Sequence, residues 1–483
     1  MRLVMKILLG LVLLEGGIVT LFYSEEYLRG RWAWERHVRA MADKGVNLDI
    51  TLLAPPPVPD NENIATAPIF AELFQTNLPG KARLAELKLP HSNRRGNEGW
   101  RAGRHLDLNI WREAFTNNNL LAALEKYAPT LREVETALER PKARFPANYA
   151  DGYFALIPQG AALLQLGKVY HCKAQAEMAA GHTTDAYRDI KTILQLEYLL
   201  KDEPTIILML VRVSLDFMVM QTLWDGLARH VWSEEQLVSL QRQLEQMDVL
   251  AYLEQAWLGE RRLNAWVLHY WLKDPRDLSD LGAAEPLPKK WSWMLLWPRG
   301  WCYQNVLRVD RAYNEKILPL VDARNRRVYP VKVDAVDQEL DHLPNSFFNI
   351  LSKILLPSTQ SLLLKVASTQ TYVAEAATAC ALERYRLAHH RYPDQLAELV
   401  PQFLAAVPND VVDGQPLRYR LDGEGGFILY SIGWNLADDG GEIAWKTEPS
   451  SSGEVRKLDL ESGDWAWRSR PITASNSVVQ SAR

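Results

Sequence analysis

An apolar segment at the N-terminus constrains the fold of this chain most. Ile7 to Leu14 is uninterrupted, Glu15 interrupts the apolar run, and Gly16 to Tyr23 resumes it. The stretch is close to the lower length limit for a helix that spans a bilayer, which is about 20 residues. Such a segment directs the following residues out of the cytoplasm, whether it is kept or cleaved. The rest of the chain is therefore expected to fold outside the cytoplasm.

Basic residues before the segment predict its orientation. Arg2 and Lys6 place the N-terminus in the cytoplasm by the positive-inside rule. A cleaved signal peptide is the alternative, but it requires small residues at the cleavage site, and residues 21–25 read Leu-Phe-Tyr-Ser-Glu. No cysteine lies nearby to carry a lipid anchor. We expect residues 1–24 to be an uncleaved single-pass anchor in the inner (cytoplasmic) membrane, with the bulk of the chain periplasmic or otherwise extracytoplasmic.

Composition excludes several classes of protein. The chain has 483 residues, of which 47% are hydrophobic and 24% charged, as in ordinary folded domains. Its net charge of −4 argues against a nucleic-acid-binding surface, which needs a dominant basic patch. Cys172, Cys302 and Cys380 are far apart and form no zinc or redox motif, so three buried free thiols are expected.

Residues 25–139 combine helical patterns with irregular segments. Tyr27 to Ala42 reads as an amphipathic helix that follows the anchor. Ala54 to Pro59, with the sequence Ala-Pro-Pro-Pro-Val-Pro, predicts an extended polyproline-type spacer. Such a spacer is semi-rigid and more often a connector than a recognition ligand.

Residues 140–345 are predicted to form a helical body. Ala161 to Ala180 and Asp185 to Leu200 both show helical periodicity, and Gly181 lies between them as a helix stop. Two helices around a glycine turn form an αα-hairpin. The hairpin resembles a tetratricopeptide repeat, although its helices are too long for the standard period and no clean second copy follows.

The apolar segment from Thr205 to Trp224 allows two interpretations. It is long enough for a second transmembrane helix, but Arg212 and Asp216 would be costly inside a membrane. The two charges lie four residues apart and can pair on one helix face, so a buried helix of a soluble domain is favoured. Residues 233–236 read Ser-Glu-Glu-Gln, a capping box that opens another helix, and Leu250 to Leu272 is expected to be helical as well.

Tryptophans gather towards the end of this body. Trp291, Trp293, Trp297 and Trp301 lie beside Lys289, Lys290 and Arg299. Aromatic rings flanked by basic residues are typical of a membrane interface. The alternative is that the rings cap the helical core.

Residues 346–470 are predicted to form an α+β module, and residues 471–483 a disordered tail. Thr371 to Ala388 is a helical pattern. Leu417 to Leu421 and Phe427 to Ser431 read as strands on either side of a glycine-rich turn, and Trp465 to Arg468 as a third strand. The fold class expected for the whole chain is mainly α, with a small antiparallel C-terminal module and one N-terminal transmembrane helix.

The order of motifs in this module resembles the globular domain of type II secretion major pseudopilins. The matching residues are Ala381–Tyr385, Arg391-Tyr392-Pro393, Pro408 and Asp410, Gly414 and Pro416, Tyr419, Tyr430–Gly433 and Asp438–Gly441. The resemblance covers about a fifth of the chain. Two departures limit it: the hydrophobic helix and processing site of a pseudopilin are missing before the module, and His390 stands where the family usually has glycine.

The pseudopilin resemblance implies a calcium site. Asn435, Asp438 and Asp439 fall in the loop where that family binds calcium, and their oxygens are ligands that calcium prefers. Asn435 stands where the family tends to have aspartate, which removes one negative charge. The alternative is a plain polar Asp-Gly turn.

The chain as a whole also resembles a family of uncharacterised membrane-anchored proteins of planctomycete- and verrucomicrobium-type bacteria. The resemblance depends on residues 56–60, residues 298–305 and residues 430–435. It implies no activity.

Motifs for catalysis are missing from the sequence. There is no HExxH, G-x-S-x-G or Walker motif. We therefore expect a non-enzymatic envelope protein that scaffolds or binds a protein partner, with no cofactor other than calcium. The alternatives are an accessory component of a type II secretion or pilus-like system, and an enzyme with an unrecognised site in the helical body.

Overall fold

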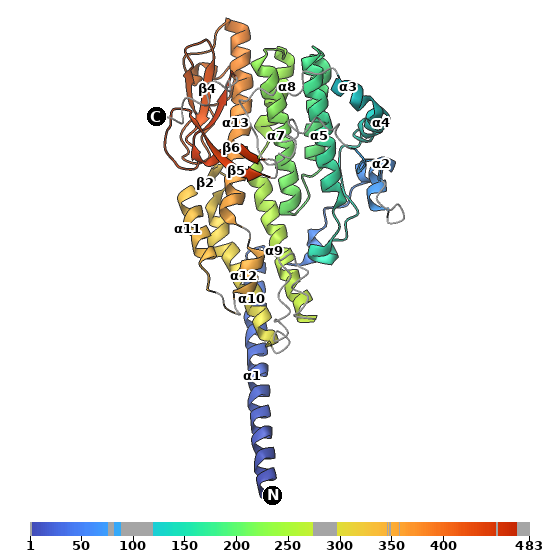
Figure 1. Ribbon diagram of the computed structural model, residues 1–483, viewed down its shortest axis with the longest axis vertical. Helices are drawn as coiled ribbons and strands as arrows, with labels where there is room; N and C mark the ends of the chain where they lie inside the picture. Colours follow the sequence, from blue (N-terminus) through green and yellow to red (C-terminus); the bar gives the residue numbers. More distant parts are fainter. Residues whose placement is uncertain are drawn as a thin grey trace.

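A computed structural model describes residues 2–75, 82–87, 119–273, 297–344, 346, 349–356, 358–450 and 453–470. The fold is mainly α, with small antiparallel sheets near the C-terminus (Figure 1), which confirms the predicted fold class. Trp291, Trp293 and the predicted tail at 471–483 lie outside the described residues.

The helices are numbered along the chain. They are α1 (Arg2–Ala42), α2 (Pro68–Ala71), α3 (Asn119–Leu124), α4 (Ala128–Ala137), α5 (Pro158–Ala179), α6 (Thr183–Tyr198), α7 (Ile206–Ala228), α8 (Glu234–Gln246), α9 (Val249–Lys273), α10 (Arg299–Ala312), α11 (Pro330–Asp341), α12 (Ile350–Leu355) and α13 (Thr359–His389). The strands are β1 (Val321–Asp322), β2 (Arg327–Val328), β3 (Arg418–Leu421), β4 (Phe427–Ser431), β5 (Ile443–Ser450), β6 (Gly453–Gly463) and β7 (Trp465–Arg468).

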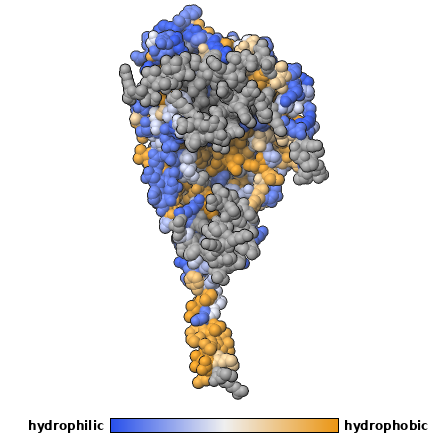
Figure 2. Space-filling model, in the orientation of Figure 1, coloured by the Kyte–Doolittle hydropathy of each residue, from blue (hydrophilic) through white to orange (hydrophobic). Residues whose placement is uncertain are grey.

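Helix α1 is one uninterrupted helix, about 60 Å long at about 1.5 Å per residue. Its first half is apolar, fully exposed, and extends alone below the body (Figures 1 and 2). The sequence predicted an anchor and a separate amphipathic helix from Tyr27 to Ala42. The structure joins them, because no glycine or proline lies between Tyr23, where the apolar segment ends, and Tyr27, where the amphipathic pattern begins. The second half packs along α10.

The predicted αα-hairpin is confirmed as α5 and α6. Gly181 occupies the turn with φ of +83°, a left-handed conformation that glycine adopts without steric strain. Behind the hairpin, α7 packs against α5, α6, α9 and α13 and is mostly buried. The structure thus places the segment from Thr205 to Trp224 in the core of the body. Ser233 caps α8 through the predicted capping box with Gln236.

The C-terminal module shares its core with the helical body. Helix α13 packs against α7 and α8 on one side and against β4 and β7 on the other. Trp224 on α7 donates a hydrogen bond to the carbonyl of Arg468 on β7, at 2.7 Å. The three thiols are free and buried, as predicted.

The strands expected from the sequence form one antiparallel sheet in the order β3-β4-β7. His390 ends α13 with φ of +58°, a left-handed conformation that glycine adopts more readily than histidine. Helix α13 begins at Thr359, earlier than the predicted start at Thr371. The β5–β6 hairpin was not predicted, because charged residues and Pro449 interrupt the alternation on which a strand prediction depends.

Candidate ligand-binding cleft

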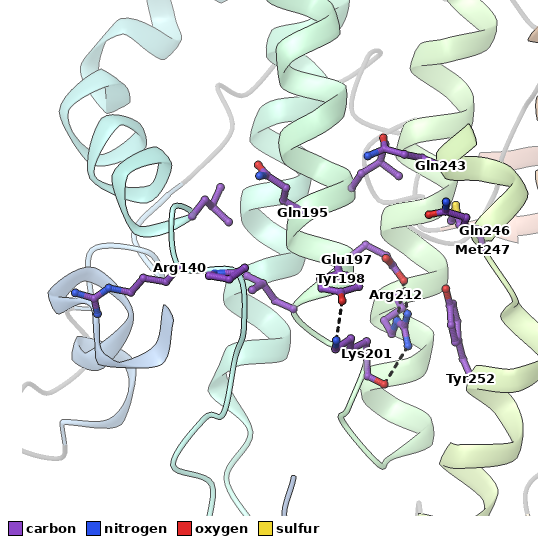
Figure 3. Close-up of a pocket in the computed structure, with 14 residues that line it drawn as sticks. Arg140, Gln195, Glu197, Tyr198, Lys201, Arg212, Gln243, Gln246, Met247 and Tyr252 are labelled. Carbon is purple, nitrogen blue, oxygen red and sulfur yellow. Dashed lines mark hydrogen bonds and ion pairs between the residues drawn. The ribbon is translucent and has the colours of Figure 1, made fainter. Parts of the chain in front are cut away.

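A cleft of about 550 Å³ opens where α6, α7, α8 and α9 meet the loop after α4 (Figure 3). This volume is typical of sites that hold small molecules or short segments of a partner. The lining residues combine apolar, amide, aromatic and charged side chains. They are Leu138, Arg140, Pro141, Leu194, Gln195, Glu197, Tyr198, Leu199, Lys201, Arg212, Gln243, Gln246, Met247 and Tyr252.

A buried ion pair forms one side of the cleft. Arg212 on α7 donates to Glu197 Oε1 on α6 from Nε at 2.8 Å and from Nη2 at 2.6 Å. Their side chains are only 4% and 6% exposed. The guanidinium also lies 3.3 Å from the ring centroid of Tyr252, in a cation–π contact. These contacts fix the position of Arg212 before any ligand binds.

Asp216 lies one helical turn beyond Arg212 and does not pair with it. Its carboxylate is fully buried, and neither oxygen has a hydrogen-bond partner within the described part of the chain. The predicted pairing of Arg212 with Asp216 is therefore wrong. Glu197 reaches Arg212 from the neighbouring helix and takes two hydrogen bonds that the Arg212–Asp216 spacing does not supply.

Burial raises the pKa of both carboxyl groups near Arg212. The pKa of Glu197 lies above its usual value because desolvation outweighs the attraction of Arg212. The pKa of Asp216 lies well above its usual value because of desolvation and the nearby charge of Glu197. One guanidinium therefore lies near two buried carboxyl groups, and the pKa of each is raised.

Lys201 and Tyr198 form the outer part of the cleft. Lys201 Nζ donates to the hydroxyl of Tyr198 at 2.7 Å and lies 4.3 Å from the centroid of the same ring. Tyr198 is 49% exposed, so this cation is held at the surface where a ligand can reach it. Gln243 adds a buried amide oxygen that has no hydrogen-bond partner in the described structure. A ligand N–H or O–H group would satisfy this oxygen.

Positive charge predominates among the charged lining residues. Three are basic, namely Arg140, Lys201 and Arg212, and one is acidic, Glu197. Arg140 extends away from the centre of the cleft (Figure 3) and donates to Thr66 Oγ1 at 2.6 Å. A partly enclosed cleft with excess positive charge attracts anionic groups. The arrangement can thus hold a negatively charged ligand whose apolar part contacts Leu194 and Met247.

The predicted calcium residues lie together in one exposed loop. Asn435 Oδ1 accepts from the amide of Ala437 at 3.2 Å, and Asp438 Oδ1 accepts from the amide of Gly440 at 3.0 Å. The sequence did not identify Asp464, which accepts from the amides of Asp439 at 3.3 Å and Gly441 at 2.6 Å. The loop thus already satisfies several of its own polar groups, as a polar turn does.

Calcium binding at this loop remains a prediction with a direct test. Calcium at about 1 mM is expected to stabilise the protein by about 0.4 to 1.4 kcal/mol if the dissociation constant lies in the range of extracellular sites. Thermal melting with and without calcium measures the effect, and Asp438→Asn is expected to abolish it. Asp422→Asn, in the neighbouring turn, is the control. An unchanged melting temperature of the wild-type protein at millimolar calcium would rule the site out.

The two described tryptophans of the predicted interface differ in environment. Trp297 is 5% exposed and packs edge-on against Trp271 and Trp301. Its ring therefore belongs to the protein interior. Trp301 is half-buried and donates from Nε1 to Glu26 on α1 at 3.0 Å. Of these two rings, only that of Trp301 retains surface that can meet lipid.

Another group of possible metal ligands lies at the turn between α5 and α6. Among the described residues, the side chains of Glu177, His182 and Asp185 lie close enough together to hold a metal ion. Lys173 lies 3.8 Å from Glu177, and Arg188 lies 2.7 Å from Asp185. These cations already balance the carboxylates, so the group is a surface ion-pair network.

Comparisons with known proteins add no relative. No protein-family model matches the chain, and neither the curated proteins nor the solved structures give a match.

Proposed function

We propose that this chain is a membrane-anchored, non-enzymatic binding protein whose helical body holds an acidic segment of a partner protein in the cleft. The observation that carries the proposal is the lining of the cleft, where Arg140 and Lys201 remain as excess positive charge after Arg212 pairs with the one lining carboxylate, Glu197. The apolar and aromatic lining suits the side chains that flank such a segment.

The anchor explains why a binding site would be placed on this body. Leu3 to Ala42 includes an exposed apolar half that is long enough to cross a bilayer. Arg2 and Lys6 favour a cytoplasmic N-terminus, so the cleft would face the extracytoplasmic side. A partner with an acidic segment would then be held close to the outer surface of that membrane.

A site-specific crosslink tests the proposal. A photoreactive amino acid in place of Gln195, which is exposed and lines the cleft, is expected to give one discrete protein adduct in native membranes. The same substitution at Gln338, an exposed residue of α11, is the matched control and is expected to give no such adduct. No difference between the two positions would contradict the proposal.

Charge reversal tests the chemistry of the ligand. Lys201→Glu is expected to weaken binding of a poly-glutamate probe peptide by about tenfold or more, which corresponds to about 1.4 kcal/mol. A poly-glutamine peptide of equal length is expected to bind weakly to both proteins. Lys44→Glu changes an exposed lysine away from the cleft and is the control. Equal affinity for the two peptides would exclude an acidic ligand.

An enzyme is the second candidate, because two carboxyl groups with raised pKa values lie near the cleft. Only Glu197 lines the cleft, whereas Asp216 is fully buried behind it. An acid–base pair needs both groups within reach of the substrate. Binding therefore has more support than catalysis. The role of a secretion accessory has support only from the resemblance of the C-terminal module.

A further inference from the structure

The second half of α1 is attached to the body by a close backbone contact. Gly30 on α1 and Gly300 on α10 face each other without room for a side chain. A Cβ atom at Gly30 would lie 2.2 Å from the carbonyl oxygen of Gly300, and one at Gly300 would lie 1.9 Å from that of Glu26. The two helices therefore cross at backbone distance, within two turns of the end of the apolar segment at Tyr23.

Buried polar contacts prevent α1 from swinging at this crossing. Asp310 on α10 is 2% exposed and accepts from Arg261 Nε on α9 at 2.8 Å. The same carboxylate meets His37 on α1 at 2.6 Å and Asn314 at 3.1 Å. Near the membrane end, Glu26 accepts from Trp301 at 3.0 Å and from Gln304 at 3.2 Å. The bonds of His37 and Glu26 join α1 to the body and would be lost if the helix moved away from it.

A continuous and docked helix fixes the height of the body above the bilayer. Tyr23 to Glu26 is one helical turn, which rises about 4.5 Å. The headgroup layer on each side of a bilayer is about 5 to 7 Å thick. The first turn of α10, which contacts Glu26, therefore lies at the depth of the lipid headgroups.

Helix α9 brings its C-terminus to the same depth. Arg261 meets α1 at the level of His37, whereas Trp271 packs on Trp297, next to the start of α10. Helix α9 thus runs towards the membrane, and its last described residue, Lys273, is exposed. Lys273, exposed Arg299, half-buried Trp301, and the Tyr27–Tyr303 ring pair at 5.9 Å make up what we call the basal surface.

We infer that the basal surface is a contact surface for anionic lipid headgroups, so that the body sits directly on the bilayer. The inference depends on the membrane anchor of the proposed function, but not on the cleft. Lys273 and Arg299 supply cations for lipid phosphates, and the aromatic rings are of the kind that occupies the headgroup layer. Free phosphate carries the same kind of charge, but it provides no headgroup layer in which the aromatic rings could lie.

The full-length protein in vesicles tests the inference. Vesicles of phosphatidylcholine with phosphatidylglycerol would carry a lipid with a photoreactive group in its headgroup. Adducts mapped by mass spectrometry are expected at Lys273, Arg299 and the Tyr27–Tyr303 pair. Adducts confined to α1 before Tyr23 would overturn the inference. If the protein failed to float with the vesicles at all, the anchor itself would be wrong.

Charge reversal separates the basal surface from general attraction to the membrane. The double variant Lys273→Glu, Arg299→Glu is expected to lose most headgroup adducts and to lose any extra thermal stability in phosphatidylglycerol nanodiscs over phosphatidylcholine nanodiscs. The matched control is Arg242→Glu, Arg391→Glu, which changes two exposed arginines away from the basal surface. Equal losses in both variants would overturn the inference. Excess inorganic phosphate is expected to leave the adducts in place; their loss would assign the surface to free phosphate.

Discussion

Replacing Arg212 by methionine is expected to destabilise the folded protein by about 3 to 5 kcal/mol at pH 7. The guanidinium is the cation that Glu197 contacts, and it offsets part of the burial cost of Asp216. Without it, both carboxyl groups remain buried with no opposite charge beside them. Urea unfolding followed by circular dichroism measures the loss.

The loss is expected to depend on pH. Burial raises the pKa of both groups above their unfolded values of 4.5 and 3.8, and removing Arg212 raises them further. The folded state then binds protons more tightly than the unfolded state, so its stability falls as the pH rises above these values. The variant should therefore approach the wild type near pH 4 and fall furthest behind at pH 7 and above.

An apolar replacement of the whole group is the control. Combining Arg212→Met with Glu197→Leu and Asp216→Val removes the buried charges together and is expected to recover most of the stability. A single Arg212→Met variant that loses less than about 1 kcal/mol at pH 7 would show that the ion pair contributes little. A loss of stability that did not change with pH would lead to the same conclusion.

Replacing Gly300 by leucine is expected to separate α1 from the body. The new Cβ would meet the backbone of Glu26 and Tyr27 at 1.9 to 2.7 Å, and backbone atoms cannot turn aside as a flexible side chain can. Overpacking of this kind costs about 3 kcal/mol at its upper range. That cost would raise the population with α1 undocked by about a hundredfold.

Trypsin cleavage in nanodiscs measures this population, because the arginines of the second half of α1 are cut only when the helix opens. Gly10→Leu is the matched control on the same helix, since no atom outside its immediate surroundings lies within 4 Å of its Cβ position. It should leave the cleavage rate unchanged. Equal rates for wild type and Gly300→Leu would mean that the close crossing does not hold α1.

Local signals in the sequence predicted much of the fold. Gly181 marked the turn between α5 and α6, and Ser233 marked the start of α8, because each residue acts on its own neighbours. The glycine-rich turn after Leu421 likewise separated β3 from β4. Contacts between distant residues were not predictable in this way. Glu197 replaced Asp216 as the partner of Arg212 because helix packing, not spacing along α7, decides which carboxylate comes closest.

The cleft was not predictable for the same reason. Its lining comes from α6, α7, α8, α9 and the loop after α4. No sequence motif links these segments to one another. The one hint in the sequence was the presence of Arg212 and Asp216 in an otherwise apolar segment. Charges at such positions need partners, and those partners came from elements that the sequence did not place.

In the membrane-anchored protein that we propose, the unbroken course of α1 would also fix the rotation of the body relative to the membrane. Each residue of an α-helix advances the chain by about 100° around its axis. Inserting one alanine between Tyr23 and Glu26 would turn the whole body by that angle about the membrane normal while raising it only about 1.5 Å. Contacts made by one face of α1 inside the bilayer would therefore determine the direction, in the plane of the membrane, in which the cleft opens.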